Sequence, residues 1–304
     1  MNGLIIVNKH QNVTSHDIVN IIRRLIPAVK IGHTGTLDPM ATGVLPICIG
    51  KATRLAEYIT ELPKKYRAGI TLGVATDTDD ATGITTAHSE VPGLIKELVE
   101  EVMHSFEGTI LQKVPAYSAI KYKGKPLYHW VRKGSEIPRK LRNIDIYSIK
   151  LIRYDPDFAP HLLIEVECSK GTYIRTLAFD LGEKIGCPAH LSLLERLSVG
   201  LFTIEESLTI DEIHKLADES KLTEAILPMD RAVAHFPKLE LNNKQVLELS
   251  QGKVIEWDKD LPNFSIVEGS KPIRVYDEAG QFRALVRLKN DEYRQFIKTL
   301  KYLS

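Results

Sequence analysis

The stretch Gly32-His33-Thr34-Gly35-Thr36-Leu37-Asp38-Pro39-Met40-Ala41-Thr42-Gly43 stands out in the chain, because it sets a single carboxylate in a run of glycines and threonines. The proline after Asp38 biases the aspartate toward extended backbone conformations, and the glycines let the chain approach a ligand closely. From local chemistry alone, a turn or capping aspartate is the more common interpretation. No Gly-Lys-Ser or Gly-Lys-Thr sequence follows, so the stretch is not a Walker phosphate-binding loop.

Hydrophobic periodicity predicts the elements on either side of this loop. Residues 3–8 are predicted to form a buried strand, and Ser15 is a candidate N-cap for a helix whose apolar spacing ends before Pro27. Residues 66–72 alternate between apolar and polar or small side chains. This alternation predicts a half-buried strand that begins with Tyr66.

Further elements follow at irregular intervals. A helix is predicted over 94–103 with Gly108 at its end, and another is predicted to have Thr172 as its cap. Because strands and helices do not alternate as regular βαβ units, we expect an α+β fold, with a mixed, largely antiparallel sheet and flanking helices. The remaining predicted elements are strands at 144–154 and 162–168 and short helices at 210–216 and 222–226.

The character of the chain changes after about residue 235. Short strand-like runs follow, separated by turn residues. The sequence therefore predicts a large domain over residues 1–235 and a small β-rich domain over residues 236–304. The runs are 254–257, 273–276 and 282–287, and the turn residues are Gly252, Pro262 and Gly280.

The composition is that of an ordinary globular protein, with 43% hydrophobic and 26% charged residues. No apolar run approaches the roughly 20 residues that span a bilayer, and the stretch from Leu4 to Val7 is too short for a signal peptide, so we expect a cytoplasmic protein.

Cys48, Cys168 and Cys187 are widely separated, which predicts buried thiols instead of a disulfide or a zinc site. The net charge is only +1, so a nucleic-acid partner requires a local basic surface.

Four motifs in order resemble those of the TruB family of tRNA pseudouridine synthases, over roughly residues 3–235. The second motif is the stretch around Asp38, which continues through Ala41-Thr42-Gly43-Val44-Leu45-Pro46 and Gly50-Lys51-Ala52-Thr53-Arg54. The others are Gly3-Leu4 to Asn8-Lys9 with Thr14-Ser15, the tyrosine motif Lys65-Tyr66-Arg67-Ala68, and the arginine motif Ser169-Lys170-Gly171-Thr172-Tyr173-Ile174-Arg175-Thr176. Small departures from the family pattern stand at His10, Asn12 and Leu197.

The resemblance implies that the protein isomerises uridine 55 in the T loop of tRNA to pseudouridine. Asp38 is then the nucleophile beside the sugar or base, and Arg175 is the cation expected to keep it ionised against the pKa rise of a closed pocket. Spacing alone would make Arg175 a solvated helix charge. The reaction exchanges a carbon–nitrogen bond for a carbon–carbon bond without net redox change, so neither a metal nor an organic cofactor is expected.

The same resemblance gives roles to further side chains. Tyr66 stacks on the flipped base and is a candidate for proton transfer at carbon 5, Tyr173 and Leu194 line the pocket, and His33 helps to displace the base or fills its space. Lys9, from the first motif, joins the substrate-binding residues. In isolation, Tyr66 and His33 would be an ordinary strand-edge tyrosine and a loop histidine.

A basic segment between residues 121 and 142 is the expected RNA-binding insertion. It contains eight basic residues, three aromatic residues and one acid, Glu136, which suits phosphate neutralisation and base stacking. A solvated surface loop is the alternative. The segment resembles the family's thumb over the T stem-loop, expected to be mobile without RNA, and residues 236–304 resemble in position a PUA-type RNA-binding domain. The candidate tRNA contacts in the insertion are Lys121, Lys123, Lys125 and Arg132.

Three other functions remain open from the sequence. An RNA-binding or RNA-folding protein without activity is disfavoured by the intact set Asp38, Tyr66, Tyr173 and Arg175, although assistance to tRNA folding is compatible with activity. The catalytic subunit of a guide-RNA-directed particle, as in dyskerin-type enzymes, is disfavoured by the basic insertion. A small-molecule hydrolase would need a second carboxylate, and none stands at a telling spacing. We expect a monomer with no obligate protein partner, because no strong apolar surface stripe is evident.

Overall fold

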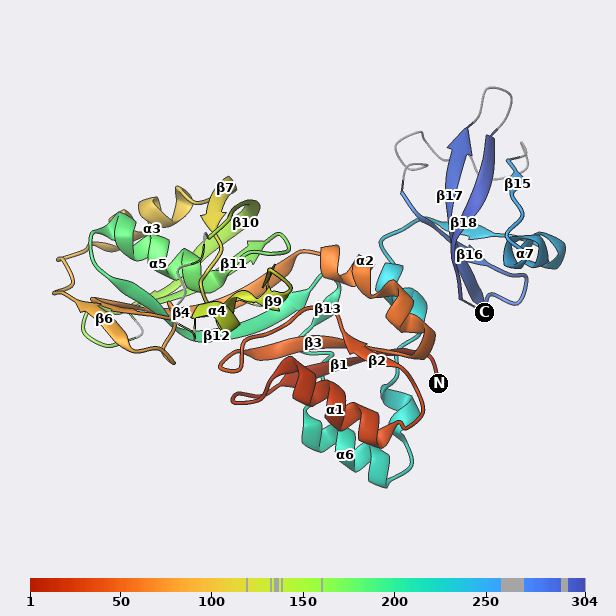
Figure 1. Cartoon of the computed structure of the whole chain (residues 1–304), viewed down its shortest axis with the longest axis horizontal. Helices are drawn as coiled ribbons and strands as arrows, with labels where there is room; N and C mark the ends of the chain where they lie inside the picture. The colour runs from red at the N-terminus through yellow and green to blue at the C-terminus, as the bar shows by residue number, and fades with distance from the viewer. Residues whose placement is uncertain are drawn as a thin grey trace.

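The computed structural model describes residues 1–118, 120–131, 133, 137, 139–159, 161–257, 271–290 and 295–303. A long sheet runs through the N-terminal part of the chain, and a smaller sheet stands apart at the C-terminal end (Figure 1). The two larger sheets of the described residues therefore have separate hydrogen-bond ladders, as expected for an α+β chain with a β-rich C-terminal part.

The long sheet has the order β1-β3-β12-β4-β11-β10-β7, with β2 paired to β3 and β13 paired to β12. Every pairing is antiparallel except that of β3 with β12. The expectation of a mixed, largely antiparallel sheet is confirmed. The strands are β1 (Gly3–Lys9), β2 (Ile31–His33), β3 (Thr42–Ile49), β4 (Lys64–Leu72), β7 (Gly108–Lys113), β10 (Leu141–Tyr154), β11 (Leu162–Cys168), β12 (Ala189–Val199) and β13 (Phe202–Thr203).

Helices flank the sheet at both ends. In Figure 1, α3 and α5 lie near β10 and β11, whereas α1 and α6 lie near β1. Two short hairpins, β5 with β6 and β8 with β9, project from the sheet. The helices are α1 (Ser15–Leu25), η1 (Gly50–Leu55), α2 (Ala56–Glu61), α3 (Lys96–His104), α4 (Leu127–Val131), α5 (Ile174–Ile185), α6 (Ile210–Asp218), η2 (Leu222–Ala225) and η3 (Met229–Val233), and the hairpin strands are β5 (Val74–Thr76), β6 (Thr85–His88), β8 (Lys121–Tyr122) and β9 (Lys125–Pro126).

The main core lies between the helices and one face of the sheet. Ile18 and Ile22 of α1 and Leu177 and Leu181 of α5 are fully buried in it. Burial of each such side chain contributes about 1.5–3 kcal/mol before entropy is counted. These contacts fix α5, and with it the arginine at its start, against the sheet.

Three predicted helix ends are wrong. Thr14, not Ser15, caps α1 and accepts a hydrogen bond from the amide of Asp17. Thr172 lies one residue too early to cap α5, and its hydroxyl donates to the carbonyl of Ser169 at 2.9 Å instead. The helix predicted over 94–103 ends at His104, and Gly108 begins β7. Local pattern places a helix end only within a few residues.

The C-terminal sheet has the order β14-β16-β17-β18-β15 and is covered by α7. Leu285 and Leu303 pack into a cluster with Leu55 and Val233, so this sheet is joined to the rest of the chain through apolar contacts. The turn predicted at Pro262 lies outside the described residues. The elements are β14 (Lys238–Glu240), α7 (Asn243–Ser250), β15 (Ile255–Glu256), β16 (Ile273–Tyr276), β17 (Phe282–Asn290) and β18 (Gln295–Tyr302).

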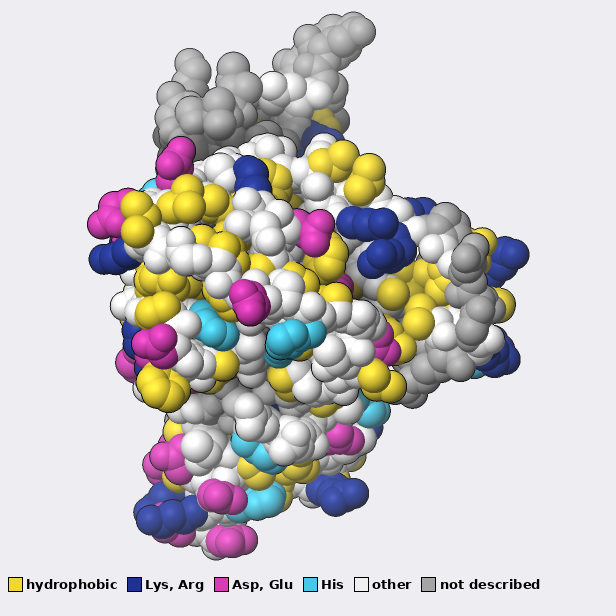
Figure 2. All heavy atoms as spheres, turned by 90° about the vertical axis from the view of Figure 1, so that its left-hand side faces the viewer, with side chains coloured by type: hydrophobic (Ala, Val, Ile, Leu, Met, Phe, Trp, Pro, Cys, Tyr) yellow, Lys and Arg dark blue, Asp and Glu magenta, His cyan; other side chains and the backbone are white. Residues whose placement is uncertain are grey.

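The cysteines lie inside the protein, and charged and apolar side chains share its surface. Cys48, Cys168 and Cys187 are all buried, as predicted. Within the described residues, no helix combines the length and the apolar character needed to cross a membrane. Figure 2 looks onto the end of the molecule that carries β6 and shows apolar, acidic and basic side chains interspersed over that face.

Candidate active site

The loop between β2 and β3 presents Asp38 because its apolar residues point inward. Leu37 and Met40 are buried, whereas Asp38 is partly exposed. Ser15 at the start of α1 anchors the loop, since its hydroxyl accepts from the amide of Leu37 at 2.8 Å and donates to the Leu37 carbonyl at 3.2 Å. The carbonyl of Asp38 accepts from the amide of Ala41 at 3.0 Å and closes a turn.

Lys9 lies beneath this loop and is fully buried. Its ammonium donates to the carbonyls of His10 at 3.0 Å, Val13 at 2.9 Å and Pro39 at 3.2 Å. All three donors of the group are thereby used. Burial lowers the pKa of Lys9 to about 8. The structure places Lys9 as a support of the loop that carries Asp38, and its predicted contact with substrate stays a prediction.

Arg196 of β12 is a second buried cation that holds the loop. Its Nε donates to the carbonyl of Val44 at 2.7 Å and its Nη2 to the carbonyl of Gly35 at 3.2 Å. Gly43, with φ of +97°, lets β3 approach β12 here, because a Cβ at this position would lie 2.3 Å from the Arg196 carbonyl oxygen. Both ends of the loop are therefore tied to one guanidinium.

Arg175, the second residue of α5, meets Asp38 in a forked ion pair. Its Nε lies 3.0 Å from Oδ2 of Asp38, and its Nη2 lies 3.3 Å from Oδ1. The guanidinium also donates to the carbonyls of Thr78 at 3.2 Å and Tyr117 at 3.0 Å. With only 6% of its side chain exposed, Arg175 is not the solvated helix charge that its spacing alone indicates.

A second carboxylate, Asp80, completes the surroundings of Arg175. Its Oδ2 lies 3.4 Å from Nη1 of Arg175. Its Oδ1 accepts from the hydroxyls of Thr78 at 2.8 Å and Thr82 at 2.6 Å and from the Thr82 amide at 3.0 Å. Asp80 is 4% exposed. Because both of its oxygens meet donors, Asp80 is positioned to orient Arg175, and not to act as the free second acid of a hydrolase.

Opposing effects set the ionisation of Asp38. Burial raises its pKa, the Arg175 guanidinium lowers it, and the Asp80 carboxylate raises it again. The balance lies above the ordinary aspartate value. Arg175 therefore limits the rise in the pKa of Asp38 but does not reverse it.

The strands bring the predicted pocket residues to this loop. Tyr66 on β4 pairs in register with Arg196, and Leu194 pairs with Ala68. Tyr66 is 9% exposed and Leu194 is 6% exposed. Burial raises the pKa of the Tyr66 hydroxyl, and the Arg196 guanidinium opposes that rise. The Tyr66 ring is thus a buried, neutral face close to the carboxylate loop.

Tyr173 and His33 stand at the ends of their elements. Tyr173 is the N-cap of α5, two residues before Arg175. His33 ends β2, and its Nδ1 is buried with no hydrogen-bond partner in the described part of the chain. Burial and the nearby Arg196 lower the pKa of His33, which favours the neutral ring. An unpaired buried nitrogen costs stability unless a ligand supplies the partner.

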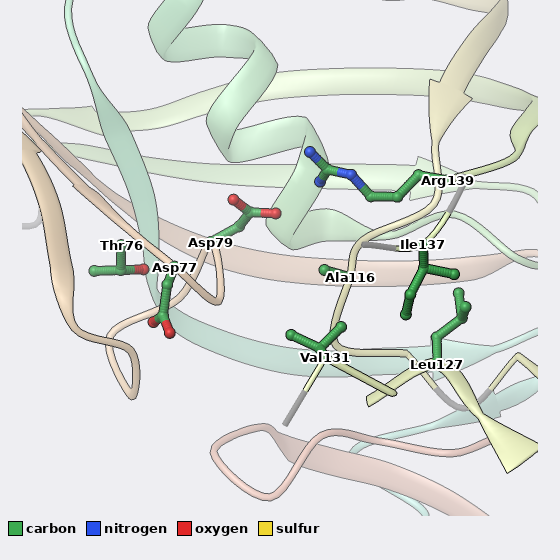
Figure 3. A pocket seen from close by; sticks show the side chains of 8 residues that line it. All are labelled: Thr76, Asp77, Asp79, Ala116, Leu127, Val131, Ile137 and Arg139. Carbon is green, nitrogen blue, oxygen red and sulfur yellow. The ribbon is translucent and has the colours of Figure 1, made fainter. Parts of the chain in front are cut away.

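The basic insertion lies beside the turn that carries Asp80. Lys123 and Lys125 are exposed, whereas the Lys121 side chain and all of Arg132 lie outside the described residues. A cavity of about 360 Å³ separates the two segments. Figure 3 shows Asp79 and Arg139 at one side of it and apolar Leu127, Val131 and Ile137 at the other.

Comparisons with known proteins agree on one family. A model of the TruB family pseudouridylate synthase N-terminal domain matches residues 23–174, and one of the tRNA pseudouridylate synthase B C-terminal domain matches residues 175–234. The tRNA pseudouridine synthase B of Bacillus licheniformis is 43% identical over 288 residues, which cover 93% of this chain and 92% of the relative. This chain belongs to the TruB family.

Other relatives extend the likeness. The tRNA pseudouridine synthase B of Clostridium tetani is 40% identical over 278 residues, which cover 91% of this chain and 93% of the relative. Among solved structures, a chain in a Cbf5-Nop10-Gar1 complex matches with a TM-score of 0.75 at 25% identity, over 99% of this chain and 85% of that chain. The family assignment made from the four motifs and the pseudouridine synthase fold are both confirmed.

Asp80 and Gln112 are two residues around the candidate site that sequence reasoning missed. Asp80 follows Asp77-Thr78-Asp79, a run that reads as an ordinary polar turn. Gln112 stands in a strand, and its side chain binds the backbone of Tyr173. No local pattern signals either role, because each partner lies far away in sequence. Only the pairing of strands brings them to the start of α5.

Proposed function

We propose that this protein converts uridine 55 in the T loop of tRNA to pseudouridine, with Asp38 as the nucleophile. The observation that carries the proposal is the forked ion pair between Arg175 and Asp38, formed by two of the four motifs. A forked guanidinium fixes the direction of a carboxylate as well as its charge. In the reaction the bond from the sugar to N1 breaks, the base turns, and the sugar bonds to carbon 5, which loses its proton as N1 gains one.

The surrounding residues take roles that follow from their positions. The Tyr66 ring offers a stacking face for the extruded base, and Leu194 and Tyr173 close the pocket around it. His33 is neutral, and its free Nδ1 accepts a hydrogen bond from RNA where the base leaves its stack. Arg175 favours the ionised form of the Asp38 carboxylate and fixes its orientation, and Asp80 contacts the far side of the Arg175 guanidinium.

RNA outside the target loop is proposed to bind the insertion and the C-terminal sheet. Lys123 and Lys125 are exposed on the insertion and suit phosphate contacts, as do the predicted contacts Lys121 and Arg132. The second sheet begins at Lys238, just after the family match ends at 234. This supports a division into residues 1–235 and a PUA-like RNA-binding domain over 236–304.

The proposed setting is a cytoplasmic monomer with no obligate protein partner. A protein that modifies tRNA must be located where the tRNA is, and this supports the cytoplasm as its location. The interspersed apolar and charged side chains on the face in Figure 2 support a monomer.

Pseudouridine formation on an unmodified tRNA transcript tests the function. The transcript is incubated with the wild type, with Asp38→Asn, and with Asp218→Asn, which makes the same change at an exposed site on α6. Nuclease digestion and mass-resolved chromatography then measure pseudouridine at position 55. We expect product from the wild type and from Asp218→Asn, and none from Asp38→Asn. Tight, salt-sensitive tRNA binding without product from any of the three would leave an RNA-binding protein and reject the enzyme.

A further inference from the structure

A second hollow opens at the end of β2 opposite to His33. It has a volume of about 480 Å³ and is lined by the start of the chain, the loop before β2, and η1. Figure 1 places the N-terminus beside the region where the C-terminal sheet meets the long sheet. The hollow therefore lies between the loop that carries Asp38 and the C-terminal sheet.

The charged side chains that line this hollow are all cationic. They are Lys30, Lys51 and Arg54, all of them exposed, and no aspartate or glutamate is among the described residues that line it. None of the three forms an ion pair with a carboxylate in the part of the chain that the structure describes. Since the net charge of the whole chain is only +1, these three side chains are a local concentration of positive charge. Such a surface attracts an anion.

The backbone beneath these cations is fixed. The Gly50 amide donates to the Lys30 carbonyl at 2.8 Å, and the Lys51 amide donates to Oδ1 of Asn2 at 2.8 Å. Gly50 has φ of +62°, and a Cβ there would lie 2.2 Å from Oδ1 of Asn2. The three segments are thus locked together at a residue that must be glycine, and the basic side chains extend from a rigid base.

Arg54 links the hollow to the C-terminal sheet. Its Nη1 donates to the carbonyl of Tyr302 at 2.5 Å, and its own carbonyl accepts from Nζ of Lys301 at 2.5 Å. Arg54 also lines the hollow, so the same side chain contacts both. An anion bound here would contact the catalytic part of the chain while lying next to β18.

We propose that this hollow binds a backbone phosphate of the tRNA outside its T stem-loop, an inference that rests on the proposed function. Phosphate is the anion that RNA presents repeatedly, and lysines neutralise it without reading sequence. The residues from Lys30 to His33 span about 10 Å at the rise of a strand, so the hollow lies outside the pocket for the target base but within the reach of other parts of the same folded tRNA. Phosphate positioning here would orient the body of the tRNA on the enzyme.

Affinity for two RNAs tests the hollow. The double variant Lys30→Ala/Lys51→Ala is compared with Lys150→Ala/Lys215→Ala, which removes the same charge from exposed positions on β10 and α6. Arg54 is left intact because it holds Tyr302. Dissociation constants are measured over a series of salt concentrations for full-length tRNA and for an isolated T stem-loop.

The proposal predicts that the hollow variant binds full-length tRNA on the order of tenfold more weakly, with the slope of log affinity against log salt reduced by about one to two. Affinity for the isolated stem-loop should match that of the control variant. An equal loss on both RNAs, or an equal loss in both variants, would overturn the proposal. Binding of inorganic phosphate to the wild type without any effect of the variant on tRNA would also overturn it, in favour of a free-phosphate site.

The affinity measurements test the phosphate site separately from the proposed enzymatic function. Pseudouridine formation by the wild type on the isolated stem-loop reports on the chemistry alone. If no pseudouridine forms but the hollow variant still loses affinity for full-length tRNA only, the enzyme proposal fails and the phosphate site stands.

Discussion

The side chain of Gln112 forms two hydrogen bonds with the backbone of Tyr173. Its Nε2 donates to the Tyr173 carbonyl at 3.0 Å, and its Oε1 accepts from the Tyr173 amide at 2.8 Å. Gln112 is 2% exposed and lies on β7, the strand that leads into the basic insertion. The base of the insertion is therefore tied to the first turn of α5, which carries Arg175.

Gln112→Leu should destabilise the protein, because the partly buried Tyr173 amide loses the Gln112 acceptor, while its carbonyl keeps the amide of Leu177. We expect a loss of about 1–3 kcal/mol in the free energy of unfolding, measured by denaturant titration. Lys113→Ala, at the exposed next position of β7, is the control and should change it by less than about 0.5 kcal/mol. Equal stability of the two variants would show that the double hydrogen bond is dispensable.

Arg175→Lys keeps the charge but loses the fork. A lysine ammonium cannot contact both oxygens of Asp38 and also reach Asp80. We expect kcat for pseudouridine formation to fall by about 10²-fold, with tRNA affinity close to that of the wild type. Single-turnover kinetics with excess enzyme would measure the chemical step. A variant with wild-type kcat would contradict a need for the forked geometry.

Asp80→Asn should also slow the reaction, though less than Arg175→Lys, because Arg175 keeps its contacts to Asp38 and to two carbonyls. A decrease in kcat of roughly tenfold is expected from imperfect positioning. The matched control is Asp77→Asn in the same turn, which retains the Oδ1 acceptor used by the Ile84 amide. If kcat is unchanged and only tRNA affinity falls, Asp80 acts on RNA binding and not through Arg175.

The pH dependence of activity should reflect the raised pKa of Asp38. In the proposed mechanism the ionised carboxylate is the reactive form, so kcat should decrease as the pH falls through the pKa of Asp38, which lies above the ordinary value of 3.8. Replacement of Arg175 by Gln removes the charge that lowers this pKa, and the acid limb should move to higher pH. Profiles of kcat against pH between about pH 4 and pH 8, for the wild type and the variant, would measure the position of the acid limb. An acid limb that stays in place would mean that another group controls it.

Asp38→Asn should raise stability while it abolishes activity. The pKa of Asp38 is higher in the folded chain than in the unfolded chain, so the folded state binds more protons and the ionised carboxylate costs stability at neutral pH. Below the unfolded pKa that cost disappears. The Tm of the variant should therefore exceed that of the wild type at neutral pH, and the difference should shrink as the pH is lowered. A lower Tm at neutral pH would show that the ion pair with Arg175 outweighs the burial of charge.

Much of the fold follows from local pattern. The alternation in residues 66–72 and 162–168 predicts β4 and β11, which are observed as Lys64–Leu72 and Leu162–Cys168. Helix ends were less predictable, since Thr14 and Ser15 are both good caps by type. Ser15 is taken instead by Leu37 of the distant loop. A contact between remote segments decided between two equal local choices.

The sequence by itself determined the family, the likeness of the loop around Asp38 to a catalytic motif, and Arg175 as the cation expected beside Asp38. These follow from motifs, which are short stretches of sequence that can be compared without knowledge of the fold. Tertiary structure alone decided that Lys9 and Arg196 support that loop from below, that Asp80 stands behind Arg175, and that Gln112 holds Tyr173. Each of these includes a contact between residues far apart in the chain. Tertiary structure also decides whether a charged side chain is buried. The sequence around a lysine or arginine does not show whether its N–H groups donate to water or to buried carbonyls.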